Sequence, residues 1–274
     1  MMRSLWSAAS GMRAQQTNVD TIANNLANVN TNGFKSNNAE FKSLLYQTVQ
    51  AKTTTMNAET KPIPAQVGLG TRLASTTKNF SQGALLATES YSDFAIEGAG
   101  FFQVRNANGD INYTRSGNFL WTTSNVNGRV ELTTQEGYPV LDRNGNPIIL
   151  PANVTGESAT ISRNDGTVGY RAADGSFVSL NQQVGLYQFR NPSGLEAVSN
   201  NLYEVTEASG NAMNEYTNNN LTRSKVTQGY LEGSNVNVAD EMVELIVAQR
   251  AYEMNSKAIT TTDDMLQQAN QLKR

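Results

Sequence analysis

Cysteine and histidine are both missing from the 274 residues of this chain. Without cysteine there is no disulfide, no thiolate nucleophile and no zinc site built on thiolates. Without histidine there is no Ser-His or Cys-His nucleophile pair and no imidazole metal ligand. We therefore expect no metal and no cofactor, and any acid–base chemistry would depend on Asp and Glu.

Charged residues and long apolar runs are also scarce. Charged residues make up 16% of the chain and the net charge is −3, which gives no electrostatic reason to expect a nucleic-acid partner. No segment approaches the ~18 consecutive apolar residues of a membrane-spanning helix. Arg13 interrupts the N-terminal segment early, so it does not resemble a cleavable signal. We expect no membrane insertion, and export, if it occurs, by a route that keeps the N-terminus.

Both ends of the chain carry apolar residues at a spacing of seven. This spacing is typical of a coiled-coil seam, so we expect paired terminal helices that form an assembly element. Gly11 is a weak point in the first helix, because glycine costs about 1 kcal/mol relative to alanine there. Asn237 is the expected N-cap of the second helix. The predicted self-assembly seam consists of Leu5, Met12, Val19, Ile22, Leu26, Val29, Val238, Leu245, Tyr252, Ile259 and Leu266.

The middle of the chain has a different pattern, with short β-forming runs from about residue 76 to 225. Dipeptides such as Asn144-Gly145 separate the runs and tolerate the positive φ angles of tight turns. Residues 46–67 lack a sustained period and contain Pro62 and Pro64, which predicts an extended connector. Examples of the runs are Phe101–Val104, Val130–Leu132, Tyr138–Leu141 and Val184–Tyr187.

These patterns predict an α+β chain with paired N- and C-terminal coiled-coil helices, a central all-β domain and an extended connector. The predicted domain division places residues 1–35 and 236–274 in the terminal-helix assembly domain, residues 36–75 and 226–235 in the connector, and residues 76–225 in the β-domain. The seam alone is compatible with two arrangements. One is a helical hairpin within a single chain, and the other is a filament in which neighbouring copies cover the apolar stripe.

Three other candidate sites are weak. The segment that begins at Asp142 starts like a calcium loop, but it has Pro147 where the loop needs glycine and Asn153 where it needs glutamate. Gly68-Leu69-Gly70 and Gly98-Ala99-Gly100 are fragments of a phosphate loop without its lysine. The carboxylates of Asp240, Glu241 and Glu244 suggest glycoside hydrolysis, but a helix N-terminus explains the first two. We expect no catalytic residues.

Three segments carry a resemblance to a known family. Residues 23–35, with the sequence Ala-Asn-Asn-Leu-Ala-Asn-Val-Asn-Thr-Asn-Gly-Phe-Lys, resemble the signature of the bacterial flagellar rod and hook proteins. Residues 249–259 are similar to the C-terminal signature of that family, and residues 98–102 to the start of its β-domain. Residues 44–48 and 231–238 are most similar to its distal-rod branch.

The resemblance implies a structural subunit that assembles into a straight hollow helical tube. The tube would carry motor torque across the periplasm to the hook. Its implied partners are further copies of the chain, the proximal rod and hook proteins, the outer ring bushing proteins and the flagellar export apparatus. Two alternatives stay open: a proximal rod or hook subunit of the same family, and a cell-wall hydrolase that depends on Asp and Glu.

Two further sets of residues follow from this interpretation. Asn24, Asn25 and Asn28 lie in a helix although asparagine is a poor helix former, so they either prepare the helix end or form hydrogen bonds between subunits. Tyr46, Gln47, Pro62 and Pro64 are assigned to a rod-specific connector.

Overall fold

The computed structural model describes residues 2–50, 64–123, 128–151, 154–163, 165–172, 176–199, 201–218 and 220–272. They group into two compact units. Unit 1 contains the described residues of Met1–Ala27, Asn37–Lys78 and Asn237–Arg274, and unit 2 contains those of Asn28–Ser36 and Asn79–Val236. The predicted mixture of helices and strands and the central β-domain are confirmed. The predicted domain boundaries stay a prediction.

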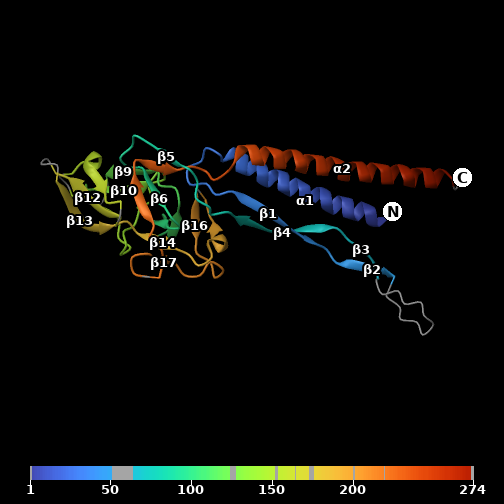
Figure 1. The fold of residues 1–274 in the computed structure, drawn as a ribbon, viewed down its shortest axis with the longest axis horizontal. Coiled ribbons are helices and arrows are strands. Elements are labelled where there is room, and N and C mark those ends of the chain that lie inside the picture. The colour runs from blue at the N-terminus through green and yellow to red at the C-terminus, as the bar shows by residue number, and fades with distance from the viewer. Residues whose placement is uncertain are drawn as a thin grey trace, which may run out of the picture. The chain divides into compact units, whose positions relative to one another are not determined.

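Two long helices, α1 (Met2–Ala27) and α2 (Val238–Gln271), lie side by side in unit 1 (Figure 1). The start of α2 is the predicted one, because the Asn237 side chain accepts a hydrogen bond of 3.2 Å from the Ala239 N–H. Asp240 and Glu241 follow in its first turn, where the helix dipole favours negative charge. In the described part of the chain, neither helix is long and apolar enough to cross a membrane.

Unit 1 also contains two antiparallel ribbons of two strands each. One pairs β1 (Asn37–Ser43) with β4 (Thr71–Lys78), and the other pairs β2 (Tyr46–Gln50) with β3 (Ala65–Gly68). A hydrogen bond of 2.9 Å from the Leu44 N–H to the Gly70 carbonyl lies between the two ribbons. Where the structure describes it, the segment predicted as an extended connector is therefore largely strand. Pro62 lies outside the described residues.

Unit 2 is built on an antiparallel sheet of six strands in the order β15-β16-β8-β7-β14-β17. Smaller sheets pair β5 with β19, β6 with β18, β9 with β10, and β12 with both β11 and β13. Two short 3-10 helices span Gly156–Ser158 and Pro192–Gly194. The strands are β5 (Leu85–Ala87), β6 (Phe94–Glu97), β7 (Phe101–Arg105), β8 (Ile111–Thr114), β9 (Phe119–Thr123), β10 (Val130–Thr134), β11 (Ala159–Ile161), β12 (Thr167–Arg171), β13 (Phe177–Gln183), β14 (Leu186–Gln188), β15 (Glu196–Ala197), β16 (Leu202–Glu204), β17 (Met213–Asn214), β18 (Lys225–Gln228) and β19 (Tyr230–Glu232).

Most of the predicted β-runs correspond to strands, with one clear exception. Phe101–Val104 lies in β7 and Val130–Leu132 in β10, whereas Val184–Tyr187 overlaps only the start of β14. Tyr138–Leu141 was wrong as a strand, since it forms only isolated bridges. Pro139 has no N–H to donate to a ladder, which explains the interruption.

The core of unit 2 has two parts. The larger one contains Phe94, Phe102 and Phe119 among aliphatic side chains. The smaller one is aromatic and contains Phe101, Tyr113, Phe189 and Tyr203, whose rings pack edge to face. Burial raises the pKa of Tyr113 to about 12, because a phenolate is poorly solvated there.

A buried ionic cluster joins four passages of the chain within unit 2. Lys35 Nζ lies 2.6 Å from Glu232 Oε1 and donates a hydrogen bond of 2.7 Å to the Ser81 carbonyl. Arg115 Nη1 lies 3.7 Å from the other carboxylate oxygen of Glu232. The Gly33 and Gly83 N–H groups donate to the carbonyl and the carboxylate of Glu232, respectively. Burial lowers the pKa of Lys35, and the Glu232 carboxylate opposes that shift.

The raised pKa of Tyr113 predicts a loss of stability at high pH. Between pH 10, where an unfolded tyrosine ionises, and about pH 12, the folded state keeps a proton that the unfolded state has lost. The free energy of unfolding should therefore fall by up to about 2.7 kcal/mol more in the parent than in Tyr113→Phe. Urea unfolding of both proteins at pH 9 and 12, followed by Trp121 fluorescence in a Trp6→Phe background, measures the difference. Equal pH dependence in the two proteins would contradict it.

The ionic cluster gives a second prediction. Lys35→Met should lower the free energy of unfolding by about 3–5 kcal/mol, because it leaves the buried Glu232 carboxylate without its closest cation. The same fluorescence assay at pH 7 measures the change. Lys225→Met is the matched control, since Lys225 is an exposed lysine on β18. If the free energy of unfolding falls equally in both variants, the buried cluster contributes no more to stability than an exposed lysine does.

Candidate assembly site

The face on which α1 and α2 meet is formed by small and apolar side chains. Ala8 and Ile22 of α1 are buried, as are Ala248 and Thr262 of α2, whereas the buried Ala14 lies toward the strand ribbons. Small side chains allow helices to approach closely. The contact covers only part of the apolar surface of each helix.

Gly11 has a role that the sequence did not reveal. A Cβ atom at this position would lie 2.9 Å from Nδ2 of Asn255. The missing side chain therefore makes room for Asn255 of α2. The interpretation of Gly11 as only a weak point in the helix was incomplete.

The predicted seam residues are covered to very different degrees in a single chain. Ile22 is buried at 3% exposure, whereas Tyr252 of α2 is 42% exposed. Val29 lies beyond the end of α1, in unit 2. The predicted seam stays a prediction. Seven seam residues are partly buried, namely Leu5, Met12, Val19, Leu26, Val29, Leu245 and Ile259. Three are exposed, namely Val238, Tyr252 and Leu266.

Among the three candidate asparagines, Asn25 is bound within its own unit. Its side chain accepts from the Asn37 N–H at 2.9 Å and donates to the Asn37 carbonyl at 2.9 Å and to Glu241 Oε1 at 3.0 Å. It thus connects α1, the start of β1 and the first turn of α2. Asn28 accepts from the Thr31 hydroxyl at 3.1 Å, and Asn24 is exposed. A role between subunits stays a prediction for all three.

The carboxylates at the start of α2 are part of this arrangement. Burial raises the pKa of Glu241, the neighbouring Glu244 and Asp240 raise it further, and the hydrogen bond from Asn25 opposes the rise. A shifted pKa in a group of carboxylates is one sign of an active site. Here the cap of α2 and the hydrogen bond from Asn25 account for the arrangement of Asp240 and Glu241.

The ribbon formed by β2 and β3 has little cover of its own. Every residue of β2 is exposed, including Tyr46 and Gln47 of the predicted connector, and Pro64 just before β3 is partly buried. Val49 and Val67 are exposed as well. An isolated ribbon of two strands is at best marginally stable in water. The ribbon is therefore a surface that gains stability when a partner covers it.

A second apolar stripe of α2 was missed by the sequence analysis. Val243, Ile246, Val247 and Met254 recur at steps of three, four or seven residues and expose more than half of their side chains. Successive residues of a helix are 100° apart, so the stripe lies well away from Ala248 and Thr262 on the α1 contact face. Its spacing was visible in the sequence, but the stronger heptad pattern hid it.

The segment that begins at Asp142 is a turn. Asp142 Oδ1 accepts from the Asn144 N–H at 2.7 Å and from the Asn146 N–H at 2.9 Å. Gly145 takes a φ of +82°, which favours glycine. Among the described residues, no group of three or more acidic side chains is placed to hold a metal ion.

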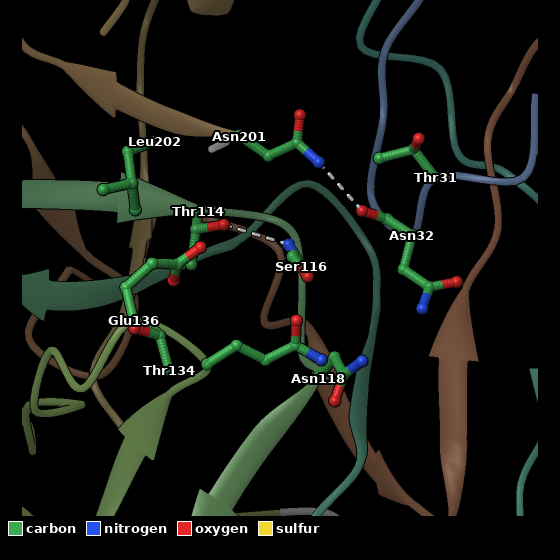
Figure 2. Close-up of a pocket in the computed structure, with 10 residues that line it drawn as sticks. Thr31, Asn32, Thr114, Ser116, Asn118, Thr134, Glu136, Asn201 and Leu202 are labelled. Carbon is green, nitrogen blue, oxygen red and sulfur yellow. Dashed lines mark hydrogen bonds between the residues drawn. The ribbon is translucent and has the colours of Figure 1, made fainter. Parts of the chain in front are cut away.

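A polar pocket in unit 2 is the other candidate site. It has a volume of about 220 Å³ and neutral polar side chains form most of its lining, as Figure 2 shows. Asn201 donates a hydrogen bond of 3.1 Å to the Asn32 carbonyl at its edge. Glu136 is the one carboxylate among the described lining residues. Glycoside hydrolysis normally needs two carboxylates across the scissile bond, so this pocket does not support a hydrolase.

Three family profiles match the chain, each over a different part. Residues 5–35 match "Flagella basal body rod protein". Residues 95–170 match "Flagellar hook protein FlgE/F/G D1 domain", and residues 227–272 match "Flagellar basal body rod FlgEFG protein C-terminal". The matches include residues 23–35, 98–102, 231–238 and 249–259, which carry the resemblance in the sequence, whereas residues 44–48 lie outside them.

Full-length relatives agree with the profiles. The chain is 45% identical to the flagellar basal-body rod protein FlgG of Borreliella burgdorferi, over 100% of both chains. It is 39% identical to FlgG of Caulobacter vibrioides over 99% of this chain and 100% of the relative, and 37% identical to FlgG of Bacillus subtilis over 100% of both. The chain therefore belongs to the FlgG family of flagellar basal-body rod proteins, a family of structural proteins and not of enzymes.

Proposed function

We propose that the chain polymerises through α1 and α2 into a straight hollow tube that forms the distal part of the flagellar rod. The observation that carries this proposal is the second apolar stripe of α2, formed by Val243, Ile246, Val247 and Met254. We call it the outer stripe. Its apolar side chains have no cover within the described chain and are each worth about 1.5–3 kcal/mol when buried. A heterologous contact that does not close gives a helical filament, in which every copy can cover the stripe of another.

The seven-residue spacing supports a coiled-coil arrangement of the two helices. In a tube, the exposed seam residues Val238, Tyr252 and Leu266 would be covered by helices of neighbouring copies. The terminal helices then form the inner wall and the β-domain faces outward. Asn24, Asn25 and Asn28 lie near the end of α1, where subunits of such a wall would meet.

The position in the rod follows from the relatives, which carry the name FlgG over the full length of the chain. In this position the tube would carry torque across the periplasm to the hook. The tube would contact the proximal rod and hook proteins at its ends and the ring bushings at its surface. The chain would be exported without a cleaved signal. The chain is also 33% identical to a Bacillus subtilis protein named flagellar hook-basal body complex protein FlhP. A proximal rod or hook subunit is therefore the second candidate.

The ribbon of β2 and β3 fits a stiffening role in this tube. A ribbon with so little cover is stable when it lies on a neighbouring subunit, and a contact of that kind would prevent subunits from sliding. Tyr46, Val49 and Val67 give it exposed side chains for such a contact. The flagellar hook shares the terminal helices but bends, so the difference has to lie outside them.

Charges in the seam should block assembly. Ile22→Asp or Leu245→Asp would place a carboxylate in each helix contact, where an unpaired buried charge costs several kcal/mol. The critical concentration for tubes should rise by about tenfold for each 1.4 kcal/mol. Sedimentation and electron microscopy measure it, and Ile22→Val is the conservative control. Tubes of both Asp variants at the parent's critical concentration would contradict the seam.

Removal of the ribbon should change stiffness and leave assembly intact. In the variant, residues 46–67 are replaced by a short Gly-Ser turn between Leu45 and Gly68, so that the Gly68 carbonyl that accepts from Ser7 is kept. We expect tubes to form, because α1 and α2 are unchanged, but to be curved or to have a shorter persistence length in electron micrographs. A double substitution, Tyr46→Ser with Val49→Ser, tests the contact without altering chain length. Tubes as straight as those of the parent in both cases would show that the ribbon has no mechanical role.

A further inference from the structure

A groove in unit 1 lies between α1 and the base of the strand ribbons. It has a volume of about 430 Å³. Trp6, Leu44 and Leu73 give it apolar walls, and Arg13 and Arg72 are the only charged residues among its described lining residues. It is therefore an apolar groove with a basic rim.

Glycine and two serines fix the shape of this groove. Ser7 of α1 donates to the Gly68 carbonyl at 3.4 Å, and the Thr71 N–H donates to the Ser10 hydroxyl at 3.3 Å. A Cβ atom on Gly70 would overlap the Ser10 side chain, and its φ of +111° also favours glycine. The ribbon base is thus held directly against α1, and the groove is formed before any partner binds.

The outer stripe of α2 has the complementary character. Val243 and Val247 form an apolar row with Ile246 beside it, and all three are exposed. Asp240 and Glu244 stand one turn apart along the edge of this row, and both are exposed. The stripe is therefore an apolar row with an acidic edge, on the part of α2 that α1 does not cover.

We propose that the groove of one copy receives the first turns of the outer stripe of a second copy. Trp6 and Leu73 would cover the apolar row, while Arg13 and Arg72 face Asp240 and Glu244. The inference rests on the proposed self-assembly and names the two surfaces that meet. Since groove and stripe are different surfaces of the same chain, the contact repeats from copy to copy without closing.

A single kind of contact between two copies would cover both the groove and the outer stripe. A helix is the element that fills a groove of this kind through anchors at steps of three and four residues. The apolar row supplies such anchors, and the opposite charges fix which end of the helix lies near Arg13 and Arg72. The contact with the chain's own α1 stays in place, because it uses the face of α2 that contains Ala248 and Thr262.

A charge-swap experiment on the full chain tests this contact. The groove variant carries Arg13→Glu and Arg72→Glu, and the stripe variant carries Asp240→Lys and Glu244→Lys. Each variant alone places like charges together, so its critical concentration should rise at least about tenfold. A one-to-one mixture should assemble near the parent's concentration, because each copy then finds an opposite partner on both surfaces.

The mixture separates a lost contact from a damaged fold, since mixing cannot restore a misfolded chain. Arg129→Glu with Lys225→Glu is the control, because both residues are exposed in unit 2 and the pair changes the net charge as the groove variant does without altering a lining residue of the groove. The inference is overturned if the single variants assemble as the parent does, or if the mixture fails as they do. If the parent forms tubes but either of these results is obtained, only the groove–stripe contact is overturned and the proposed function is retained. A parent that forms no tubes overturns both.

Discussion

The buried carboxylate of Glu232 is the point on which the β unit depends. It holds Lys35 at 2.6 Å and Arg115 at 3.7 Å, and its backbone carbonyl accepts from Gly33. Removing the Glu232 carboxylate would leave two buried cations without compensation, which costs far more than a surface ion pair contributes. The segments just after α1 and just before α2 are thereby fixed to one another.

The two helices divide their surfaces between internal and external contacts. One face of α2 meets α1 through Ala248 and Thr262, which are small, whereas Val247 and Met254 stay exposed on another face. Large exposed apolar side chains in a stripe are unusual for a monomer, in which such residues normally occur singly. The most apolar surface of the helix pair thus remains outside the chain's own contacts. In the described part of unit 1, α2 therefore leaves an apolar surface exposed.

Local patterns in the sequence predicted local structure well. The cap at Asn237 and the glycine turn at Gly145 follow from the conformational preferences of single residues, and both were found. The ion pair of Lys35 with Glu232 could not be predicted, since 197 positions separate the residues and neither stands out locally. Gly11 was misjudged for a related reason: its use depends on Asn255 of the other helix. The seam could be seen from its spacing, but which neighbour covers it is not encoded in a spacing.

Some of the residues that carry the family resemblance serve the fold of one chain. Asn25 binds Asn37 and Glu241, and Lys35 is buried against Glu232. Other residues of the same segments, among them Tyr252 and Met254, stay exposed. The contact proposed above would add exposed charges outside these segments, such as Arg13 and Arg72. The shared segments therefore combine residues that serve the fold of one chain with residues that stay exposed. In the proposed contact, the charges of the groove and of the stripe would be the features that distinguish one neighbour from another.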